Sequence, residues 1–234
     1  MARDVVLVHS SDVHVDDGDV GGYHSGNRGL RAVLLTAVDA GADLVLLAGD
    51  TFDNPRVSTG VLRESAALLA ACPVPVVMLP GNHDPLLPAC IFRRAGIVEL
   101  QNVSIFGIDA DEVMGFAGLD LEISGKAHVS FDSMHPFHAP RGRGARFHVV
   151  MAHGHYVPEA EWQEQSHRSW LISDATLAET GADYVALGHW DRPTPVGAGV
   201  VPAFYSGSPD MAKTVNVVRL GDAVAVERVG LRWE

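Results

Sequence analysis

A six-residue segment, Pro-Gly-Asn-His-Asp-Pro at 80–85, follows directly after an apolar run that ends at Leu79. Asn82 offers a neutral oxygen ligand, and His83 offers a ring nitrogen that can bind a metal or carry a proton. Gly81 gives the backbone the freedom to turn these side chains toward one point. The segment therefore suits chemistry that needs a bound cation and a mobile proton.

Three further clusters of this kind follow other apolar runs: Asp12-Val13-His14, Gly49-Asp50-Thr51-Phe52-Asp53 and Gly188-His189-Trp190-Asp191. A histidine also follows the run at 147–152, where His153 and His155 compete for one ligand position. His153 is favoured because it comes directly after the strand, which leaves His155 at the rim.

The predicted metal ligands are three carboxylates, three imidazoles and one amide: Asp12, His14, Asp50, Asn82, His153, His189 and Asp191. This set contains no thiolate, so it suits Mn²⁺, Fe or Zn²⁺. One metal takes about four protein ligands. Seven candidates therefore predict two metals, roughly 3.5 to 4 Å apart, that share one carboxylate.

The strands that must position these residues are continuous, β-branched runs at 5–9, 43–48 and 74–79. Helices are predicted between them, from Asn27 to about Ala40 and from about Ser58 to Ala71. The resulting β-α-β-α-β order places the polar clusters at the carboxyl ends of strands, where open α/β sheets hold their sites.

Later elements are shorter. Strands are predicted at 103–108, 147–152 and 184–187, helices at 86–96 and 173–180, and a terminal hairpin turns at Gly221-Asp222. Residues 16–26 predict a loop, and residues 109–145 predict long loops. The 234 residues show no internal repeat or low-complexity linker. We therefore expect a single domain over 1–234, with helices covering a layered sheet.

The composition excludes several classes of protein. With 47% apolar and 20% charged residues the chain is expected to fold compactly, and its net charge of −12 disfavours wide, nonspecific binding to nucleic acid or anionic membranes. Two cysteines and no signal-peptide pattern predict a cytoplasmic protein without a membrane partner. The arginine-rich segment 141–146 is expected to be a solvated loop or to contact a phosphate backbone.

The five ordered blocks resemble the calcineurin-like metallophosphoesterase superfamily, whose signature is D-x-H, G-D-x-x-D, G-N-H-D, a separate His and G-H-x-H. The resemblance spans residues 12–191. It implies a four-layer α/β/β/α fold, which is a layered β-sandwich flanked by helices. It also implies two divalent metals, for which Mn²⁺ is favoured over Fe or Zn²⁺. The metal ligands it implies are Asp12 and His14 for one metal, Asn82, His153 and His189 for the other, and Asp50 as the bridge.

The same resemblance implies catalytic roles for two residues. His83 would contact the phosphate or protonate the leaving oxygen, and Asp53 would orient His83. The last block departs from the signature, because Asp191 stands where the family has its second histidine. Asp191 can ligate a metal and add one negative charge, or it can turn outward toward Arg192.

Three segments resemble the SbcD-type DNA repair nucleases: Gly-Asp-Thr-Phe-Asp at 49–53, Tyr-Val-Ala-Leu-Gly-His at 184–189 and Tyr-Ser-Gly-Ser-Pro at 205–209. This implies hydrolysis of phosphodiester bonds by a metal-activated water, with DNA as substrate of an exonuclease or endonuclease, and an ATPase partner. Two alternatives stay open: a small-molecule phosphodiesterase or phosphomonoesterase, and a noncatalytic metal-binding scaffold.

Other residues predict no chemistry of their own. Trp162 and Trp170 are expected to pack in the core or to form a wall for substrate. Six histidines have no motif around them and predict ordinary surface or core positions: His24, His128, His135, His138, His148 and His167.

Overall fold

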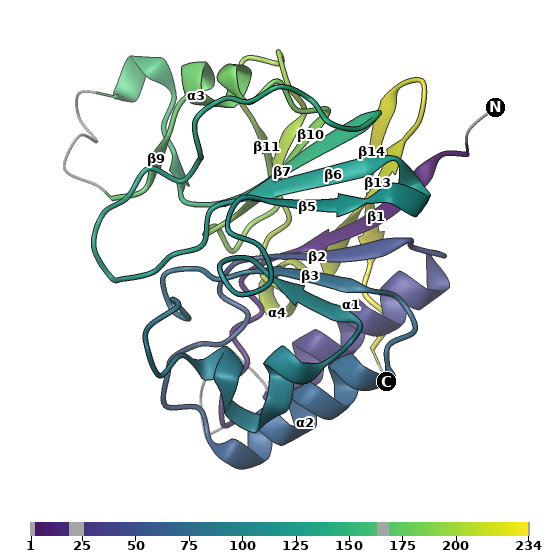
Figure 1. Ribbon diagram of the computed structural model, residues 1–234, viewed down its shortest axis with the longest axis vertical. Helices are drawn as coiled ribbons and strands as arrows, with labels where there is room; N and C mark the ends of the chain where they lie inside the picture. Colours follow the sequence, from purple (N-terminus) through teal and green to yellow (C-terminus); the bar gives the residue numbers. More distant parts are fainter. Residues whose placement is uncertain (1–2, 19–25, 163–168, 234) are drawn as a thin grey trace.

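Two six-stranded sheets lie face to face at the centre of the molecule (Figure 1). The computed structural model of the chain describes residues 3–18, 26–162 and 169–233. Most of the predicted loop at 16–26, together with His24 and His167, lies outside these residues. Helices flank the two sheets on their outer sides, so the predicted layered α/β/β/α fold is confirmed.

The first sheet has the order β14-β13-β1-β2-β3-β4. Its strands are β1 (Val5–Ser10), β2 (Leu44–Ala48), β3 (Val76–Leu79), β4 (Val103–Ile105), β13 (Thr214–Leu220) and β14 (Val224–Gly230). The strands β1 to β4 run parallel, and the predicted terminal hairpin pairs antiparallel with β1. The carboxyl ends of β1, β2 and β3 therefore meet at one edge of the molecule.

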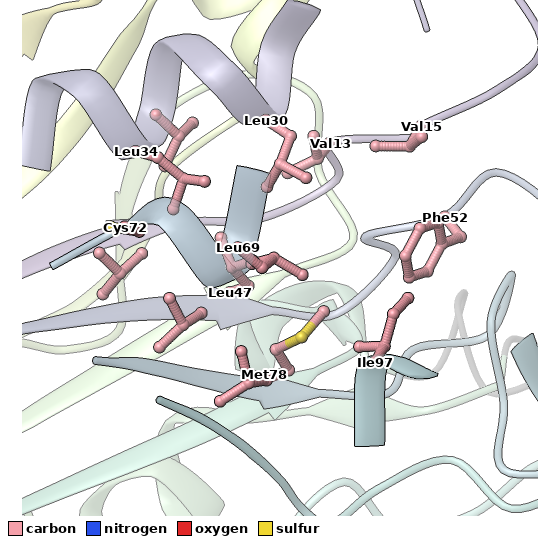
Figure 2. Packing of buried hydrophobic residues seen from close by; sticks show 14 of the residues in the cluster. Val13, Val15, Leu30, Leu34, Leu47, Phe52, Leu69, Cys72, Met78 and Ile97 are labelled. Atoms are coloured by element: carbon pink, nitrogen blue, oxygen red, sulfur yellow. The ribbon is translucent and has the colours of Figure 1, made fainter. Parts of the chain in front are cut away.

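Two helices, α1 (Arg28–Asp39) and α2 (Thr59–Ala71), cover the outer face of this sheet. Figure 2 shows Leu30 and Leu34 of α1 and Leu69 of α2 in the same apolar cluster as Leu47 and Met78 of the sheet. The 3.6-residue spacing of the apolar positions predicted this packing.

Asn27 precedes α1, as predicted, but its side chain does not cap that helix. Its amide donates to the Val61 carbonyl oxygen of α2, and its Oδ1 accepts from the Ser65 hydroxyl. Ser58 does cap α2, because its hydroxyl accepts from the Val61 N–H. Asn27 therefore ties the two helices together instead of ending one of them.

The second sheet has the order β11-β12-β10-β7-β6-β5. Its strands are β5 (Val113–Phe116), β6 (Leu121–Gly125), β7 (Phe147–His153), β10 (Tyr184–Gly188), β11 (Thr194–Val196) and β12 (Ala203–Tyr205). The helix α3 (Asp174–Glu179) lies on its outer side. The remaining elements are β8 (His155–Tyr156), β9 (Leu171–Ile172), α4 (Pro209–Ala212) and the 3-10 helices η1 (Ile91–Glu99), η2 (Ala117–Leu119) and η3 (Glu159–Glu161).

Alternate side chains of the central strands meet between the sheets. Leu7 and Leu46 from one sheet and Val149 and Tyr184 from the other are fully buried there. His9 shares this layer, where its ring nitrogens lie 2.8 Å from the Tyr184 hydroxyl and 3.2 Å from the Leu187 carbonyl oxygen. Burial lowers the pKa of His9 to about 3, so this residue is a neutral part of the core.

Three sequence-based expectations were wrong in detail. Residues 109–145, which were expected to form long loops, contain β5 and β6. The polar residues Glu122 and Ser124 suggest a solvated loop, but both side chains are buried and paired in β6. The helix expected at 86–96 begins only at Ile91, as a 3-10 helix, and is interrupted at 94–96, where Ala95 has a φ angle of 56°. The strand expected at 103–108 ends at Ile105.

The arginine-rich segment 141–146 is fixed by carboxylates. Arg141 lies 3.3 Å from Glu122, and Arg143 lies 3.0 Å from Asp183. Arg146 packs over the Phe147 ring. These pairs tie the loop to the second sheet. Within the described ranges, no helix has the length and apolar character that a bilayer crossing requires.

Candidate metal centre

Backbone strain is concentrated at the predicted ligands. Asp12, His14 and Asp50 have φ angles of 51°, 49° and 50°, and His189 has a φ angle of 106°. A residue with a side chain in this region costs on the order of 1–3 kcal/mol, and such residues cluster at functional sites. The turns after β1, β2 and β10 therefore hold four predicted ligands in a backbone conformation that residues with a side chain rarely adopt.

Two glycines let these turns approach each other. Gly49 has a φ angle of +95°, and a Cβ atom built there would overlap with the His153 ring. A Cβ atom at Gly188 would overlap with the Ala48 carbonyl oxygen. Only a residue without a side chain leaves room for the His153 imidazole between the two sheets.

Asn82, His153 and His189 converge with the carboxylate of Asp50, and we name these four residues the buried group. His153 Nε2 lies 3.0 Å from Asn82 Oδ1 and 3.1 Å from Asp50 Oδ2. His189 Nδ1 lies 3.1 Å from the same Asn82 oxygen. His153 Nδ1 donates to the Ala48 carbonyl oxygen at 3.0 Å, which leaves Nε2 as the nitrogen available to a metal.

Asp50 also belongs to a second set of candidate ligands. The ligand atoms of Asp12, His14 and Asp50 lie within 4.8 Å of one another, and so do those of Asp50, His153 and His189. Asp12 is held in place because its carboxylate accepts from the His189 backbone N–H at 2.9 and 3.1 Å. Asp50 is the carboxylate shared by both sets, which is the place of a bridging ligand.

His14, Asp53 and His83 form a third set, which we name the open group. The His83 side chain is 44% exposed, and the Asp53 side chain is 32% exposed. His83 Nδ1 donates to the Asp53 backbone carbonyl at 2.7 Å, whereas the Asp53 carboxylate lies 3.8 Å away. That carboxylate lies closer to His14 Nδ1, at 3.2 Å. Asp53 therefore orients His83 through its main chain.

The buried carboxylates are electrostatically strained. Burial raises the pKa of Asp12 to about 6. Burial also opposes the charge of Asp50, but the charge of His153 outweighs it and holds the pKa of Asp50 below its usual range. Burial lowers and Asp50 raises the pKa of His153, which reaches about 9. Burial and the neighbouring His153 lower the pKa of His189 to about 3.

The opposite shifts of Asp50 and His153 describe a buried carboxylate that is ionised beside a positive charge, with the carboxyl group of Asp12 close by. A divalent cation would offset the remaining negative charge and would displace the proton from His153. The donors are carboxylate oxygens, an amide oxygen and neutral imidazole nitrogens, which is a set that Mn²⁺, Fe and Zn²⁺ accept. The residues present therefore fit a pair of divalent metals around Asp50.

The structure does not bring Asp191 into any of these sets. Asp191 is exposed, and its backbone carbonyl accepts from the Ser208 N–H at 3.1 Å. Among the described residues its carboxylate makes no ion pair with Arg192. His155 also stands outside the sets, and its Nδ1 accepts from the Trp190 ring N–H at 3.0 Å.

Two further residues support the centre. The Asp84 carboxylate accepts from the Gly81 N–H at 2.7 Å and from the Phe52 N–H at 3.0 Å, so it pins two ligand-bearing turns together. His128, which the sequence suggested was ordinary, is fully buried and donates from Nε2 to the His153 carbonyl oxygen at 3.0 Å. No spacing signal in the sequence marks His128, because its contact depends on the packing of the sheets.

Comparison with known proteins agrees with this geometry. The model of the family described as calcineurin-like phosphoesterase matches residues 5–193. The chain belongs to this family. The predicted family is thereby confirmed, and the match covers most of the chain.

Curated relatives of this calcineurin-like phosphoesterase are distant. The metallophosphoesterase YhaO of Bacillus subtilis is 25% identical over 228 residues, covering 89% of this chain and 54% of the relative. The DNA double-strand break repair protein Mre11 of Aeropyrum pernix is 23% identical over 248 residues, covering 96% of this chain and 58% of the relative. The chain thus spans about half the length of these two relatives.

Solved structures share the fold at low sequence identity. A putative 5'-nucleotidase from Staphylococcus aureus aligns with a TM-score of 0.63 at 14% identity, over 99% of this chain and 54% of that one. The protein TT1561 of Thermus thermophilus aligns with a TM-score of 0.62 at 12% identity, over 98% of this chain and 100% of that one. These likenesses establish the fold of this calcineurin-like phosphoesterase and nothing finer.

Proposed function

We propose that the chain hydrolyses phosphodiester bonds with two divalent metal ions and that DNA is its substrate, in the manner of a repair exonuclease or endonuclease. The observation that carries the proposal is the pair of ligand sets that share Asp50. A shared carboxylate between two metals is the arrangement that places two cations on one phosphate.

Each residue has a role in this proposal. Asp12 and His14 would hold one metal, the buried group would hold the other, and Asp50 would bridge them. When bound, the metals supply Lewis acidity, which lowers the pKa of water and stabilises charge on the phosphate oxygens. The chain supplies a rigid frame for them, because the buried side chains are fixed by hydrogen bonds to Ala48 and to the turns.

His83 is the proposed proton carrier. Its Nδ1–H is held by the Asp53 carbonyl, and its ring stands edge-on to the His14 ring with centroids 4.8 Å apart. Its side chain is 44% exposed, which supports a role in which Nε2 stabilises the phosphate or gives a proton to the leaving oxygen.

Support for a diester comes from two sources. Relatives include proteins named Mre11, a DNA double-strand break repair protein. The nuclease-like segment at 205–209 also lies beside the site, since the Tyr205 hydroxyl donates to the Gly154 carbonyl at 2.7 Å and the Ser206 hydroxyl lies 2.9 Å from that of Ser11. By resemblance we also propose an ATPase partner, which would add the affinity for DNA that a net charge of −12 works against.

A substrate panel with Mn²⁺ tests the proposal. We expect hydrolysis of bis(4-nitrophenyl) phosphate and of single-stranded or end-exposed DNA in preference to 4-nitrophenyl phosphate. The His83→Ala variant is the matched control for contaminating nucleases, because it should keep its metals. Efficient cleavage of monoesters with no cleavage of DNA at any enzyme concentration would shift the assignment to a phosphomonoesterase.

A further inference from the structure

A short segment next to the metal centre exposes large apolar side chains. Val129 is 61% exposed and Phe131 is 60% exposed, and both lie in the connection between β6 and β7. Single exposed apolar residues are ordinary on a protein surface, so the meaning of these two depends on what holds them beside the centre.

The segment is anchored to the centre at its first residue. The His128 N–H donates to the Pro80 carbonyl at 3.1 Å, and the His128 carbonyl accepts from the Leu86 N–H at 2.8 Å. These bonds clamp both sides of the 80–85 turn, which carries Asn82 and His83. The His128 ring lies edge-on to the His153 ring, with centroids 5.6 Å apart.

A second anchor holds the other end. The Trp170 ring N–H donates to the Asp132 carbonyl at 3.0 Å. The Trp170 ring also lies edge-on to His128 and to His189, at centroid distances of 5.1 and 5.9 Å. Figure 1 shows this connection and the β9 segment on the same side of the molecule. We name residues 128–132 the lip.

Fixed at His128 and Asp132, the lip holds Val129 and Phe131 close to the centre. The Cα atom of Phe131 can lie no more than about 11 Å from that of His128, because consecutive Cα atoms are about 3.8 Å apart. The lip contains one acidic residue, Asp132, and no lysine or arginine. It therefore cannot attract a phosphate backbone by charge, and what it offers is apolar and aromatic contact.

We infer that the lip binds the organic group attached to the scissile phosphate, and that Phe131 stacks on a flat, unpaired ring such as a nucleobase. The inference rests on the proposed phosphodiesterase function and adds the chemistry of the group next to the phosphate. Stacking on an aromatic side chain tolerates any base and needs no positive charge, which suits an acidic chain. Paired bases inside a duplex offer no free face to Phe131, so the lip selects ends and single strands.

A binding measurement tests the inference without relying on hydrolysis. Isothermal titration of the Mn²⁺-loaded protein compares uridine 5'-monophosphate with ribose 5-phosphate, which has the same sugar and phosphate but lacks the base. We expect the wild type to bind the nucleotide about 5- to 150-fold more tightly, the effect of one stacked ring. Phe131→Ala should abolish that difference and leave the affinity for ribose 5-phosphate unchanged.

An exposed valine at the opposite edge of the second sheet provides a matched control for Val129. Val200 is 72% exposed and lies between β11 and β12, so Val200→Ser should leave both affinities at wild-type values. Val129→Ser should weaken nucleotide binding less than Phe131→Ala does. Melting temperature and manganese content should match the wild type in all three variants, because the changed side chains are exposed.

The outcomes separate this inference from the proposed function. The inference about the lip is wrong if the wild type binds the two ligands equally, or if Phe131→Ala keeps the preference for the nucleotide, even if diesters are hydrolysed. A preference lost in Phe131→Ala supports the lip even if no ester is cleaved, in which case the proposed function is wrong. If Phe131→Ala instead converts a dimer to a monomer in sedimentation, the surface joins two copies of the chain and the inference is wrong.

Discussion

The buried group and the open group use the same residue types in opposite ways. In the buried group, His153 is fully buried and both of its ring nitrogens are committed, one to Ala48 and one toward Asn82 and Asp50. In the open group, His83 has one nitrogen held by the Asp53 carbonyl and a side chain that is 44% exposed.

That difference separates binding from chemistry. A metal ligand gains from a rigid position and from hydrogen bonds that fix its tautomer. A proton carrier needs access to the reacting oxygen and to solvent. A backbone carbonyl holds Nδ1 in both His153 and His83, so these two histidines are distinguished by the environment of Nε2 and not by their place in a motif.

Removing the residue that belongs to both metal sets should have the largest effect. Asp50→Ala should lose both metals and lower hydrolysis by more than about 10⁴-fold, because metal activation is worth several kcal/mol of transition-state stabilisation. Elemental analysis of protein soaked in Mn²⁺ measures the loss. Asp50→Asn is the matched variant, since it keeps the shape and removes the charge. Full metal content in Asp50→Ala would contradict the shared carboxylate.

The next largest effect belongs to the open group. His83→Ala should keep its metals and lose about 10² to 10⁴ in kcat, the range for one general acid. Asp53→Asn should lose much less, because the bond that orients His83 comes from the main chain. Steady-state kinetics on a diester checks this order. A loss in Asp53→Asn as large as that in His83→Ala would show that the carboxylate, and not the carbonyl, is needed.

A smaller effect on metal binding is expected from a change at His128, which contacts the buried group without being a predicted ligand. His128→Phe keeps a ring against His153 but removes the donor to the His153 carbonyl, which should weaken Mn²⁺ binding about 10- to 100-fold. His148→Phe is the control: that histidine is also buried, but it bonds Ser124 within the second sheet. Both variants can lower the melting temperature, whereas a calorimetric titration should find weaker metal binding only in His128→Phe. Equal metal affinities in the two variants would show that His128 does not support metal binding.

The sequence predicts the residues of the buried group better than the residues that hold them in place, and the reason is physical. Asp50 and Asn82 follow continuous apolar runs, so parallel strands must bring their turns to one edge. His128 reaches His153 only through the packing of the second sheet, and its local sequence has no periodic signal. The strand β6 was missed because Glu122 and Ser124 look solvated, yet Glu122 pairs with Arg141 and Ser124 with a histidine. The main-chain bond to His83 depends on turn geometry that residue types do not encode.

The smallest effect is expected at Asp191, where the sequence departs from the family signature. Its exposed carboxylate lies outside both metal sets, and its carbonyl bond to Ser208 survives any substitution. Asp191→Ala should therefore keep wild-type metal content and activity. If Asp191 ligates the first metal instead, Asp191→Ala would weaken that site, and Asp191→His would strengthen Zn²⁺ or Fe binding by restoring an imidazole. Titrations of both variants with Mn²⁺ and Zn²⁺ separate these outcomes, because only a ligand changes the preference between the two metals.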